Sequence, residues 1–272
     1  MATVRLAICQ LKVREGKEGN LNRAREMVLQ AARNGAAVVA LPEMFNCPYE
    51  EEAFAAYAEV YPAGPTFTML AAAAAEARVY LFGGSLPEKD GERLFNTCFV
   101  YDPGGNLLAR HRKVHLFDVA LDTLTFRESD TFTAGDTPTV VRTPFGKIGV
   151  AVCYDLRFPE LARLMVDRGA EIFIIPAAFN TVTGPAHWEL LLRARAVDNQ
   201  VFVAGAAPAA GRLRRYETYG HSAVVDPWGA VVARAGAGET ILYADLDLRL
   251  VHDVRRKLPL LANRRPEVYA QK

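Results

Sequence analysis

Short, continuous apolar runs alternate with helix-length amphipathic stretches along this chain, and this alternation restricts its fold more than any other feature. Residues 37–41 are apolar throughout and residues 170–175 are apolar except for Glu171, and each run is followed by a proline, Pro42 or Pro176. Such runs are typical of parallel strands that are buried on both faces. Because parallel strands need crossover connections, usually helices, the pattern predicts an α/β protein in which helices cover the sheets.

The second half of the chain repeats the order of elements in the first half. The predicted strands are residues 4–11, 37–41, 79–83, 147–153, 170–175 and 201–206, and the predicted helices are residues 21–34, 66–78, 159–168, 186–199 and 246–257. Each half also contains a predicted hairpin with an Asp-Pro turn, over residues 98–112 and 222–234. No Ser-, Gly- or Pro-rich linker separates the halves. We therefore expect one domain with two sheets over residues 1–257, followed by a C-terminal arm over residues 258–272.

The composition argues against several classes of function. The chain of 272 residues has 32 basic and 31 acidic side chains, which gives a formal net charge of +1 and no general basic surface for nucleic acid or anionic membranes. Its longest apolar runs are far shorter than the ~20 residues of a membrane-spanning helix. The N-terminus does not resemble a signal peptide, and the four cysteines form no Cys-x-x-Cys pair. These features predict a cytoplasmic protein with free thiols.

Cys153 is the candidate nucleophile, because it directly follows the apolar run 148–152 and precedes a predicted helix. The carboxyl ends of strands are where open α/β sheets bind ligands. Backbone N–H groups and the helix dipole at such a turn are expected to lower the pKa of the thiol. The alternative for a free cysteine is a small buried apolar side chain. We expect that role for Cys9 and Cys98, which lie in predicted strands, and leave Cys47 open.

Three charged residues are candidate partners of this cysteine. Glu43 follows a predicted buried strand, where partial desolvation would raise its pKa and suit a general base. Lys113 ends the first hairpin, and Glu128 lies in a predicted loop, residues 117–136, that is long enough to indicate a function. Taken alone, each of these residues could equally be a solvated surface charge.

Histidines offer a weaker signal. His111 and His115 share one face of a strand end, a spacing that does not bring two rings to one metal ion, so we expect no metal site. His187 opens a predicted helix after Gly184-Pro185, and its default role is structural.

The candidate residues match the signatures of a known family. Leu-Pro-Glu at 41–43, His-Arg-Lys-Val-His-Leu-Phe at 111–117 and Val-Cys-Tyr-Asp-Leu-Arg-Phe-Pro-Glu at 152–160 resemble the three signatures of the nitrilase superfamily, the carbon–nitrogen hydrolases. Their order and separations fit, and residues 184–189 and 197–200 extend the resemblance over essentially the whole chain. The segments at 45–49, 115–118, 125–129 and 178–180 resemble the ω-amidase (Nit2-like) branch. Nitrilases proper usually carry Trp where this chain has Tyr154.

The resemblance implies an αββα four-layer sandwich and a Glu43–Lys113–Cys153 triad, often joined by Glu128, with no metal or organic cofactor. In the implied reaction Glu43 takes the thiol proton and the thiolate of Cys153 attacks a carboxamide. Lys113 and the backbone N–H of Tyr154 would stabilise the oxyanion. Ammonia leaves, and water hydrolyses the resulting thioester.

The branch resemblance further implies a small-molecule substrate, the terminal amide of a dicarboxylic acid, such as α-ketoglutaramate or succinamate. The remote carboxylate of such a substrate needs a cation or several donors. We expect Tyr49 and Thr125 as neutral donors, and Arg157 as a cation unless it forms a structural ion pair. The resemblance also favours a homodimer or larger homo-oligomer, without nucleic acid or membrane partners.

Other functions remain compatible with the sequence. A deaminated-glutathione amidase shares residues 184–189 and 219–222, and an N-carbamoyl amino acid hydrolase uses the same triad. A papain-like thiol hydrolase would instead pair Cys153 with His187. A non-catalytic interaction protein on the same fold would leave the triad unused.

Overall fold

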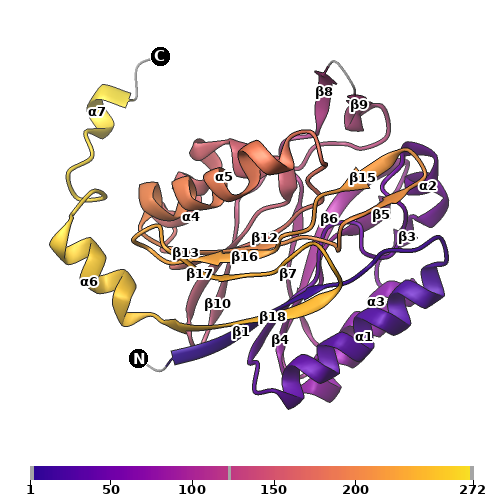
Figure 1. Cartoon of the computed structure of the whole chain (residues 1–272), viewed down its shortest axis with the longest axis horizontal. Helices are drawn as coiled ribbons and strands as arrows, with labels where there is room; N and C mark the ends of the chain where they lie inside the picture. The colour runs from indigo at the N-terminus through magenta and orange to yellow at the C-terminus, as the bar shows by residue number, and fades with distance from the viewer. Residues whose placement is uncertain (1–2, 122–123, 270–272) are drawn as a thin grey trace.

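The computed structural model describes residues 3–121 and 124–269, and it contains two large sheets with helices on their outer faces (Figure 1). The first sheet has the strand order β18-β1-β2-β4-β6-β5-β3, with β7 paired to β6. Its strands are β1 (Thr3–Gln10), β2 (Val38–Ala40), β3 (Glu59–Val60), β4 (Tyr80–Phe82), β5 (Leu86–Asp90), β6 (Arg93–Tyr101), β7 (Leu107–Arg112) and β18 (Thr240–Asp247).

The second sheet has the order β10-β11-β12-β13-β16-β17. Its strands are β10 (Thr139–Thr143), β11 (Gly146–Val150), β12 (Ile172–Pro176), β13 (Phe202–Ala206), β16 (Ala223–Val225) and β17 (Val231–Arg234). In each sheet three parallel strands are followed by an antiparallel hairpin, β1-β2-β4 with β6-β7 and β11-β12-β13 with β16-β17. The expectation of two similar halves is confirmed.

The remaining elements cover the sheets or connect them. The helices are α1 (Lys17–Arg33), α2 (Glu51–Tyr57), α3 (Pro65–Ala77), α4 (Pro159–Asp167), α5 (Gly184–Asn199), α6 (Arg249–Lys257) and α7 (Pro266–Tyr269). Two small hairpins, β8 (Asp118–Leu121) with β9 (Leu124–Arg127) and β14 (Gly211–Leu213) with β15 (Tyr216–Thr218), stand apart from the large sheets.

The alternation of side chains along β1 shows how the layers form, because successive residues of a strand point to opposite faces. Val4, Leu6 and Ile8 belong to the core cluster shared with the second sheet, whereas Ala7 and Cys9 pack in the cluster beneath α1 and α3. On the far side, α4 and α5 cover the second sheet (Figure 1). The four layers are therefore α, β, β and α, as predicted.

Two sequence-based expectations about local structure were wrong. The segment that begins at Leu246 was expected to be helical, but Leu246 lies in β18, which pairs antiparallel with β1 along all eight of its residues, and α6 begins at Arg249. Alternate burial of Ala244 and Leu246 is the period-two signal that the helix assignment overlooked. The predicted loop at 117–136 contains the hairpin β8–β9 and a short 3₁₀ helix, Glu128–Asp130.

The C-terminal segment continues from β18 of the first sheet into α6 and then runs past α4 (Figure 1). Val251 and Val254 are the buried side chains of α6. Further along, Arg264 forms an ion pair with Asp167 at 2.6 Å. None of the helices in the described part of the chain is both long and apolar enough to span a lipid bilayer.

Gly84 allows the loop after β4 to approach the turn that carries Glu43. Its φ is +61°, and a Cβ atom there would lie 2.1 Å from the carbonyl oxygen of Pro42. Next to it, the Ser85 N–H donates to that same oxygen at 3.2 Å, and the Ser85 hydroxyl accepts the Met44 N–H at 3.2 Å. The turn after β2 is thus held by the backbone of the loop after β4, and the close contact leaves no room for a side chain at position 84.

We therefore expect Gly84→Ala to lower the free energy of unfolding more than Gly91→Ala. Gly91 has nearly the same φ, +60°, but nothing lies within 4 Å of a Cβ there, so it isolates the left-handed strain, roughly 1–2 kcal/mol. Gly84→Ala adds overpacking against backbone, typically about 1–3 kcal/mol more. Urea denaturation of both variants measures the difference, and equal losses would show that the contact at Pro42 is unimportant.

Candidate active site

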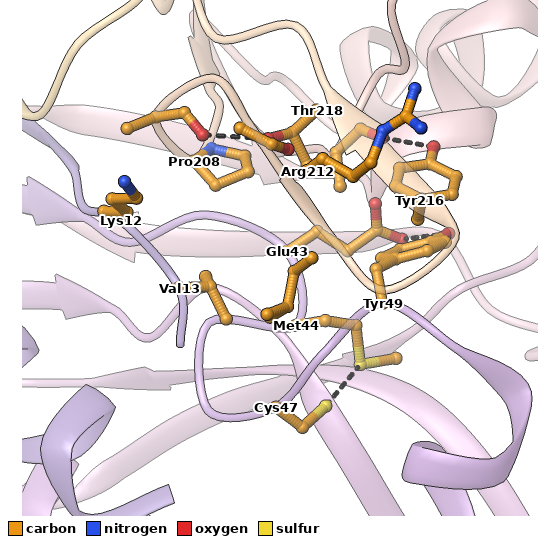
Figure 2. Close-up of a pocket in the computed structure, with 14 residues that line it drawn as sticks. Lys12, Val13, Glu43, Met44, Cys47, Tyr49, Pro208, Arg212, Tyr216 and Thr218 are labelled. Carbon is orange, nitrogen blue, oxygen red and sulfur yellow. Dashed lines mark hydrogen bonds between the residues drawn. The ribbon is translucent and has the colours of Figure 1, made fainter. Parts of the chain in front are cut away.

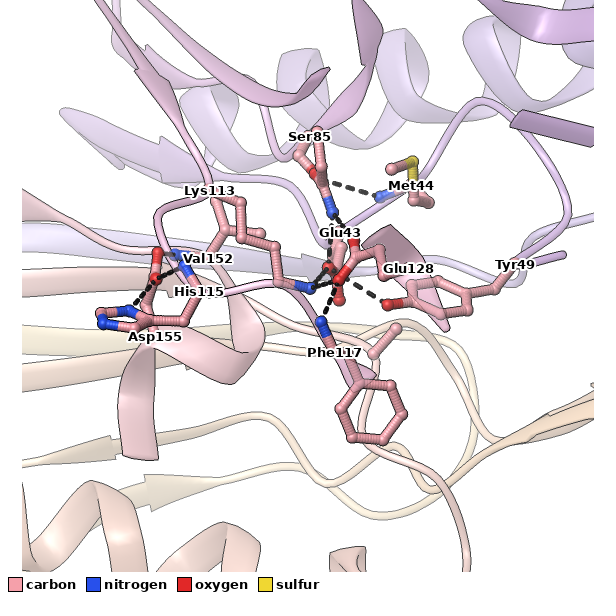
Figure 3. Close-up of polar contacts among 12 residues, drawn as sticks. Glu43, Met44, Tyr49, Ser85, Lys113, His115, Phe117, Glu128, Val152 and Asp155 are labelled. Carbon is pink, nitrogen blue, oxygen red and sulfur yellow. Dashed lines mark hydrogen bonds and ion pairs between the residues drawn. The ribbon is translucent and has the colours of Figure 1, made fainter. Parts of the chain in front are cut away.

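Three charged side chains meet without exposure to solvent between the two sheets. Glu43 and Lys113 are each 1% exposed and Glu128 is 0% exposed. The Lys113 Nζ lies 2.9 Å from Glu43 Oε1 and 2.7 Å from Glu128 Oε2 (Figure 3). Burying charges is expensive unless they are paired and hydrogen-bonded. Two carboxylates share one ammonium here, so the cluster carries one excess negative charge when both glutamates are ionised.

Additional hydrogen-bond donors help to offset the cost of burying the two carboxylates. The Phe117 N–H donates to Glu128 Oε2 at 2.7 Å, and the Asn96 side-chain amide donates to Glu128 Oε1 at 2.9 Å and to Glu43 Oε1 at 2.8 Å. The Tyr49 hydroxyl lies 3.5 Å from Glu43 Oε1. Glu43 Oε2 is buried and has no hydrogen-bond partner within the described residues. One carboxylate oxygen is thus occupied, and the other is available to a proton.

Cys153 lies beside this cluster at the start of a 3₁₀ helix, Cys153–Arg157, and is 5% exposed. Its φ of +47° is in the left-handed region, which is uncommon for any residue but glycine and is often found at functional sites. Burial, and then the negative charge of Glu43, raise the pKa of the Cys153 thiol well above its usual value, although Lys113 opposes them.

The expectation that this turn lowers the thiol's pKa was therefore wrong. A short 3₁₀ helix offers little dipole, and desolvation outweighs the charge of Lys113. A raised pKa favours the neutral thiol over the thiolate, so Cys153 needs a base. Burial also raises the pKa of Glu43, against the attraction of Lys113, which gives that carboxylate a greater affinity for a proton.

Asp155 ties the turn of Cys153 to the segment that carries Lys113 (Figure 3). Its carboxylate accepts the Val152 N–H at 3.0 Å and the His115 N–H at 2.9 Å, and it hydrogen-bonds to the buried His111 ring at 3.1 Å. Although burial acts to raise the pKa of Asp155, the hydrogen bonds from both histidines keep it below its usual value. The carboxylate is therefore charged at neutral pH.

Two pockets reach this centre from different sides. The first, which we call the Cys153 pocket, is lined by Cys153, Phe117, Tyr154, Arg157, Phe179, Asn180, Thr183 and Tyr216. The second, the Glu43 pocket, is lined on one side by Glu43, Met44, Cys47 and Tyr49 and on the other by residues of the segment 208–218, including Arg212 and Tyr216, with Lys12, Val13 and Ala178 also on its wall (Figure 2). Tyr216 lines both pockets, and its hydroxyl donates to the Ala178 carbonyl at 2.5 Å.

The three residues expected to bind the substrate lie in different surroundings in the structure. Tyr49 is buried beside Glu43, whereas Thr125 is exposed on β9 and shares a surface pocket with Glu50, Glu51 and Glu52. In the Cys153 pocket, the Arg157 guanidinium lies 5.7 Å from the centre of the Tyr154 ring and 5.1 Å from that of Phe179.

The structure does not show the ion pair that we considered for Arg157. No carboxylate lies within ion-pair distance of its guanidinium in residues 3–121 and 124–269. Its Nη1 instead lies 3.2 Å from Nδ1 of His187, which is exposed. Glu43, rather than His187, is the basic group whose proximity shifts the pKa of the Cys153 thiol.

Sequence reasoning missed Asn96, Tyr216 and the role of Asp155. Asn96 sits inside β6 among apolar residues, where no local signal indicates its neighbours.

The other three cysteines are all buried, so Cys47, which the sequence left open, resembles Cys9 and Cys98. In the same described ranges, no group of three or more His, Cys, Asp or Glu side chains could hold a metal ion.

Comparison with known proteins agrees with this geometry. The family model described as carbon-nitrogen hydrolase matches residues 5–256. The chain belongs to the carbon–nitrogen hydrolase family. It is accordingly a hydrolase that acts on C–N bonds other than peptide bonds.

Individual members of the family are similar over nearly the whole chain. Omega-amidase NIT2 of Mus musculus is 49% identical over 270 residues, which cover 99% of this chain and 98% of the relative. Nit3 of Saccharomyces cerevisiae, from branch 10 of the nitrilase superfamily, superposes with a TM-score of 0.90 at 42% identity and 97% coverage of both chains. These similarities place the chain in the nitrilase superfamily and its Nit2-like branch.

A more distant member illustrates cysteine reactivity on this fold. In a mutant of the amidase from Nesterenkonia sp. AN1, acrylamide has undergone Michael addition at the active-site cysteine. That structure has a TM-score of 0.75 and 26% identity, covering 94% of this chain and 98% of the other.

We expect Glu43→Gln to make the Cys153 thiolate form at lower pH. The substitution removes a negative neighbour that raises the thiol's pKa and leaves Lys113, which lowers it. Thiolate absorbance near 240 nm, with Cys153→Ala as the blank, reports the titration. Burial raises the pKa of Cys9 to about 12 and also raises those of Cys47 and Cys98, so these thiols stay silent below that pH.

Glu88→Gln is the matched control, because Glu88 is 1% exposed and pairs with Arg110 and Arg112 rather than with the site. Its thiolate titration should follow that of the parent. A Glu43→Gln titration that is unchanged or shifted to higher pH would remove Glu43 as the group that holds the thiol proton.

Proposed function

We propose that the protein is an amidase of the ω-amidase type, which cleaves the terminal amide of a small dicarboxylic acid monoamide, such as α-ketoglutaramate or succinamate, through a thioester on Cys153. The observation that carries the proposal is the unpartnered Oε2 of the buried Glu43 beside a neutral thiol. The similarity to omega-amidase NIT2 of Mus musculus supports the substrate class.

Acylation begins with proton transfer from the thiol to Glu43. The sulfur of Cys153 attacks the amide carbon, and the carbonyl π electrons move to the oxygen. The Lys113 ammonium and the backbone N–H of Tyr154 stabilise that oxyanion, an effect for which each donor is typically worth about 3–4 kcal/mol. The C–N bond then breaks, Glu43 gives its proton to the departing nitrogen, and ammonia leaves a thioester.

Deacylation reverses the proton path with water as the nucleophile. Glu43 takes a proton from water, the hydroxyl attacks the thioester carbon, and the C–S bond breaks. Cys153 recovers the proton from Glu43, and the free acid is released. One carboxylate therefore acts as base and acid in both halves, a task that the raised pKa of Glu43 suits.

Glu128 has a supporting role in this scheme. Burial disfavours the Lys113 ammonium, but Glu128 and then Glu43 raise the pKa of Lys113 well above its usual value, so it remains charged throughout the reaction. The 2.7 Å contact of Lys113 with Glu128 fixes the ammonium, which leaves it oriented for the substrate oxygen.

The remote carboxylate of the substrate is assigned to Arg157. This guanidinium lines the Cys153 pocket, as described above, and no carboxylate within the described ranges neutralises it. Tyr49 adds a hydroxyl group and lines both the Glu43 pocket and the surface pocket that contains Thr125. Thr125 completes the proposed set, although the three neighbouring glutamates make its surroundings less favourable for an anion.

We expect succinamate to be hydrolysed with a kcat/KM at least ~10²-fold higher than that of butyramide, because only succinamate offers the carboxylate whose binding energy aids the reaction. Arg157→Met and Tyr49→Phe should reduce this ratio, mainly through succinamate. Ammonia release measures all of these rates. Equal rates on both amides in the parent would reject carboxylate recognition. A preference for deaminated glutathione or an N-carbamoyl amino acid would move the assignment to a neighbouring branch.

We also propose that the protein forms a homodimer or a multiple of one. The C-terminal arm exposes the apolar side chains of Leu258, Leu260, Val268 and Tyr269, and Leu164 on the neighbouring α4 is 50% exposed. Their burial against a second copy would contribute favourably to association.

Removal of the arm after Lys257 should weaken this association. Sedimentation velocity of the intact and the truncated chain at micromolar concentration provides the comparison. Circular dichroism must show that the truncated chain keeps its fold, since Leu261 packs against the core. A full-length monomer, or a truncated chain with an unaltered oligomer, would contradict the proposal.

A further inference from the structure

Asn96 contacts each of the three charged residues of the site. It lies in β6 and is 1% exposed. Its side-chain Nδ2 donates to Glu43 Oε1 at 2.8 Å and to Glu128 Oε1 at 2.9 Å, and its main-chain carbonyl accepts the N–H of Lys113 at 2.8 Å. One residue on a central strand therefore links both carboxylates and the backbone that carries the ammonium.

The orientation of the Asn96 amide is imposed by the two carboxylates. Its Oδ1 is buried without a hydrogen-bond partner among the described residues. Rotating the amide by half a turn would place this oxygen against two carboxylate oxygens, which is repulsive. Leaving an amide oxygen unsatisfied is unfavourable, so the two hydrogen bonds to Glu43 and Glu128 must outweigh that penalty.

We propose that Asn96 is a positioning residue that keeps Glu43 ionised in the resting enzyme and directs its free Oε2 to the thiol of Cys153. Asn96 and Lys113 both bind Oε1 of Glu43, so Oε2 is left as the oxygen that can accept a proton. This inference rests on the proposed role of Glu43 as the general base.

The groups around Glu43 show why a neutral donor is needed there. Besides Asn96, this carboxylate is influenced by Lys113, Glu128, Cys153 and the hydroxyls of Tyr49 and Tyr216, with Cys47 further along its own loop. Lys113 is the cation in this set, and it is shared with Glu128. A second cation would neutralise the base, whereas an amide donates hydrogen bonds without adding charge.

The sign of the effect on pH dependence follows from these contacts. A hydrogen bond to the charged form of a carboxyl group lowers its pKa. Loss of the Asn96 donor therefore raises the pKa of Glu43, and the acidic limb of the kcat/KM profile moves to higher pH. Activity lost near neutral pH should return in part as the pH is raised, which a purely structural defect would not produce.

The test is the pH profile of succinamate hydrolysis by Asn96→Leu, which keeps the number and branching of the side-chain heavy atoms and removes both donors. We expect the acidic limb to move up by about one pH unit, the tenfold change in equilibrium constant expected for one charge-assisted hydrogen bond. Asn96→Ser, which retains one short donor, should shift less and serves if the leucine variant does not fold. An unshifted limb, or a loss that is the same at every pH, would overturn the proposal.

Thr97→Val is the matched control on the same strand. Thr97 is also fully buried, and its hydroxyl donates to the carboxylate of Glu88 at 2.7 Å, away from the site. The valine variant loses a comparable hydrogen bond, so it should lose stability without moving the pH profile. A shift in this control equal to that of Asn96→Leu would show that any buried defect in β6 perturbs Glu43.

A second readout separates this inference from the proposed function. Infrared difference spectra over pH, with Glu43→Gln as the blank, report protonation of Glu43 without any substrate. A shift to higher pH in Asn96→Leu supports the inference even if succinamate is not hydrolysed, in which case the substrate proposal alone fails. Succinamate hydrolysis with an unshifted infrared titration would overturn the role of Asn96 and leave the proposed function intact.

Discussion

The burial of Glu43, Lys113 and Glu128 at one point between the sheets is the constraint on which the site depends. Moving an ion out of water costs several kcal/mol even after relaxation, and three such groups are inaccessible here. The structure offsets this penalty with two ion pairs and with donors from β6 and from the backbone of Phe117. The same low exposure that makes the cluster expensive also raises the proton affinity of Glu43, which its chemistry requires.

The site also requires both sheets to pack together. Glu43 follows β2 and Lys113 follows β7 in the first sheet, whereas Cys153 follows β11 in the second. The cluster of Val4, Leu6 and Ile8 with the strands of the second sheet therefore holds nucleophile and base at a working distance. A defect in the interior of the sandwich would be expected to affect catalysis as well as stability.

Local backbone features then fix the orientation of each group. The left-handed φ of Cys153 is held by Asp155, whose carboxylate binds the N–H of Val152 just before the cysteine and the N–H of His115 just after Lys113. On the opposite side, Gly84 lets the loop after β4 support the turn of Glu43. Strained or closely packed backbone of this kind persists because its surroundings determine it fully.

The sequence alone predicted the fold class and the two similar halves, and its resemblance to the nitrilase superfamily singled out Glu43, Lys113 and Cys153 at predicted strand ends. Buried parallel strands leave continuous apolar runs, and strand ends are marked by proline or glycine, so both kinds of information are local. The prediction of a helix from Leu246 was wrong because the sequence of an edge strand and that of a short helix can have a similar apolar content. Tertiary structure alone decided that burial raises the pKa of the Cys153 thiol, that Asp155 joins two segments and that Asn96 joins two carboxylates. These properties arise from desolvation and from contacts between residues far apart in the chain, which no local pattern of side chains encodes.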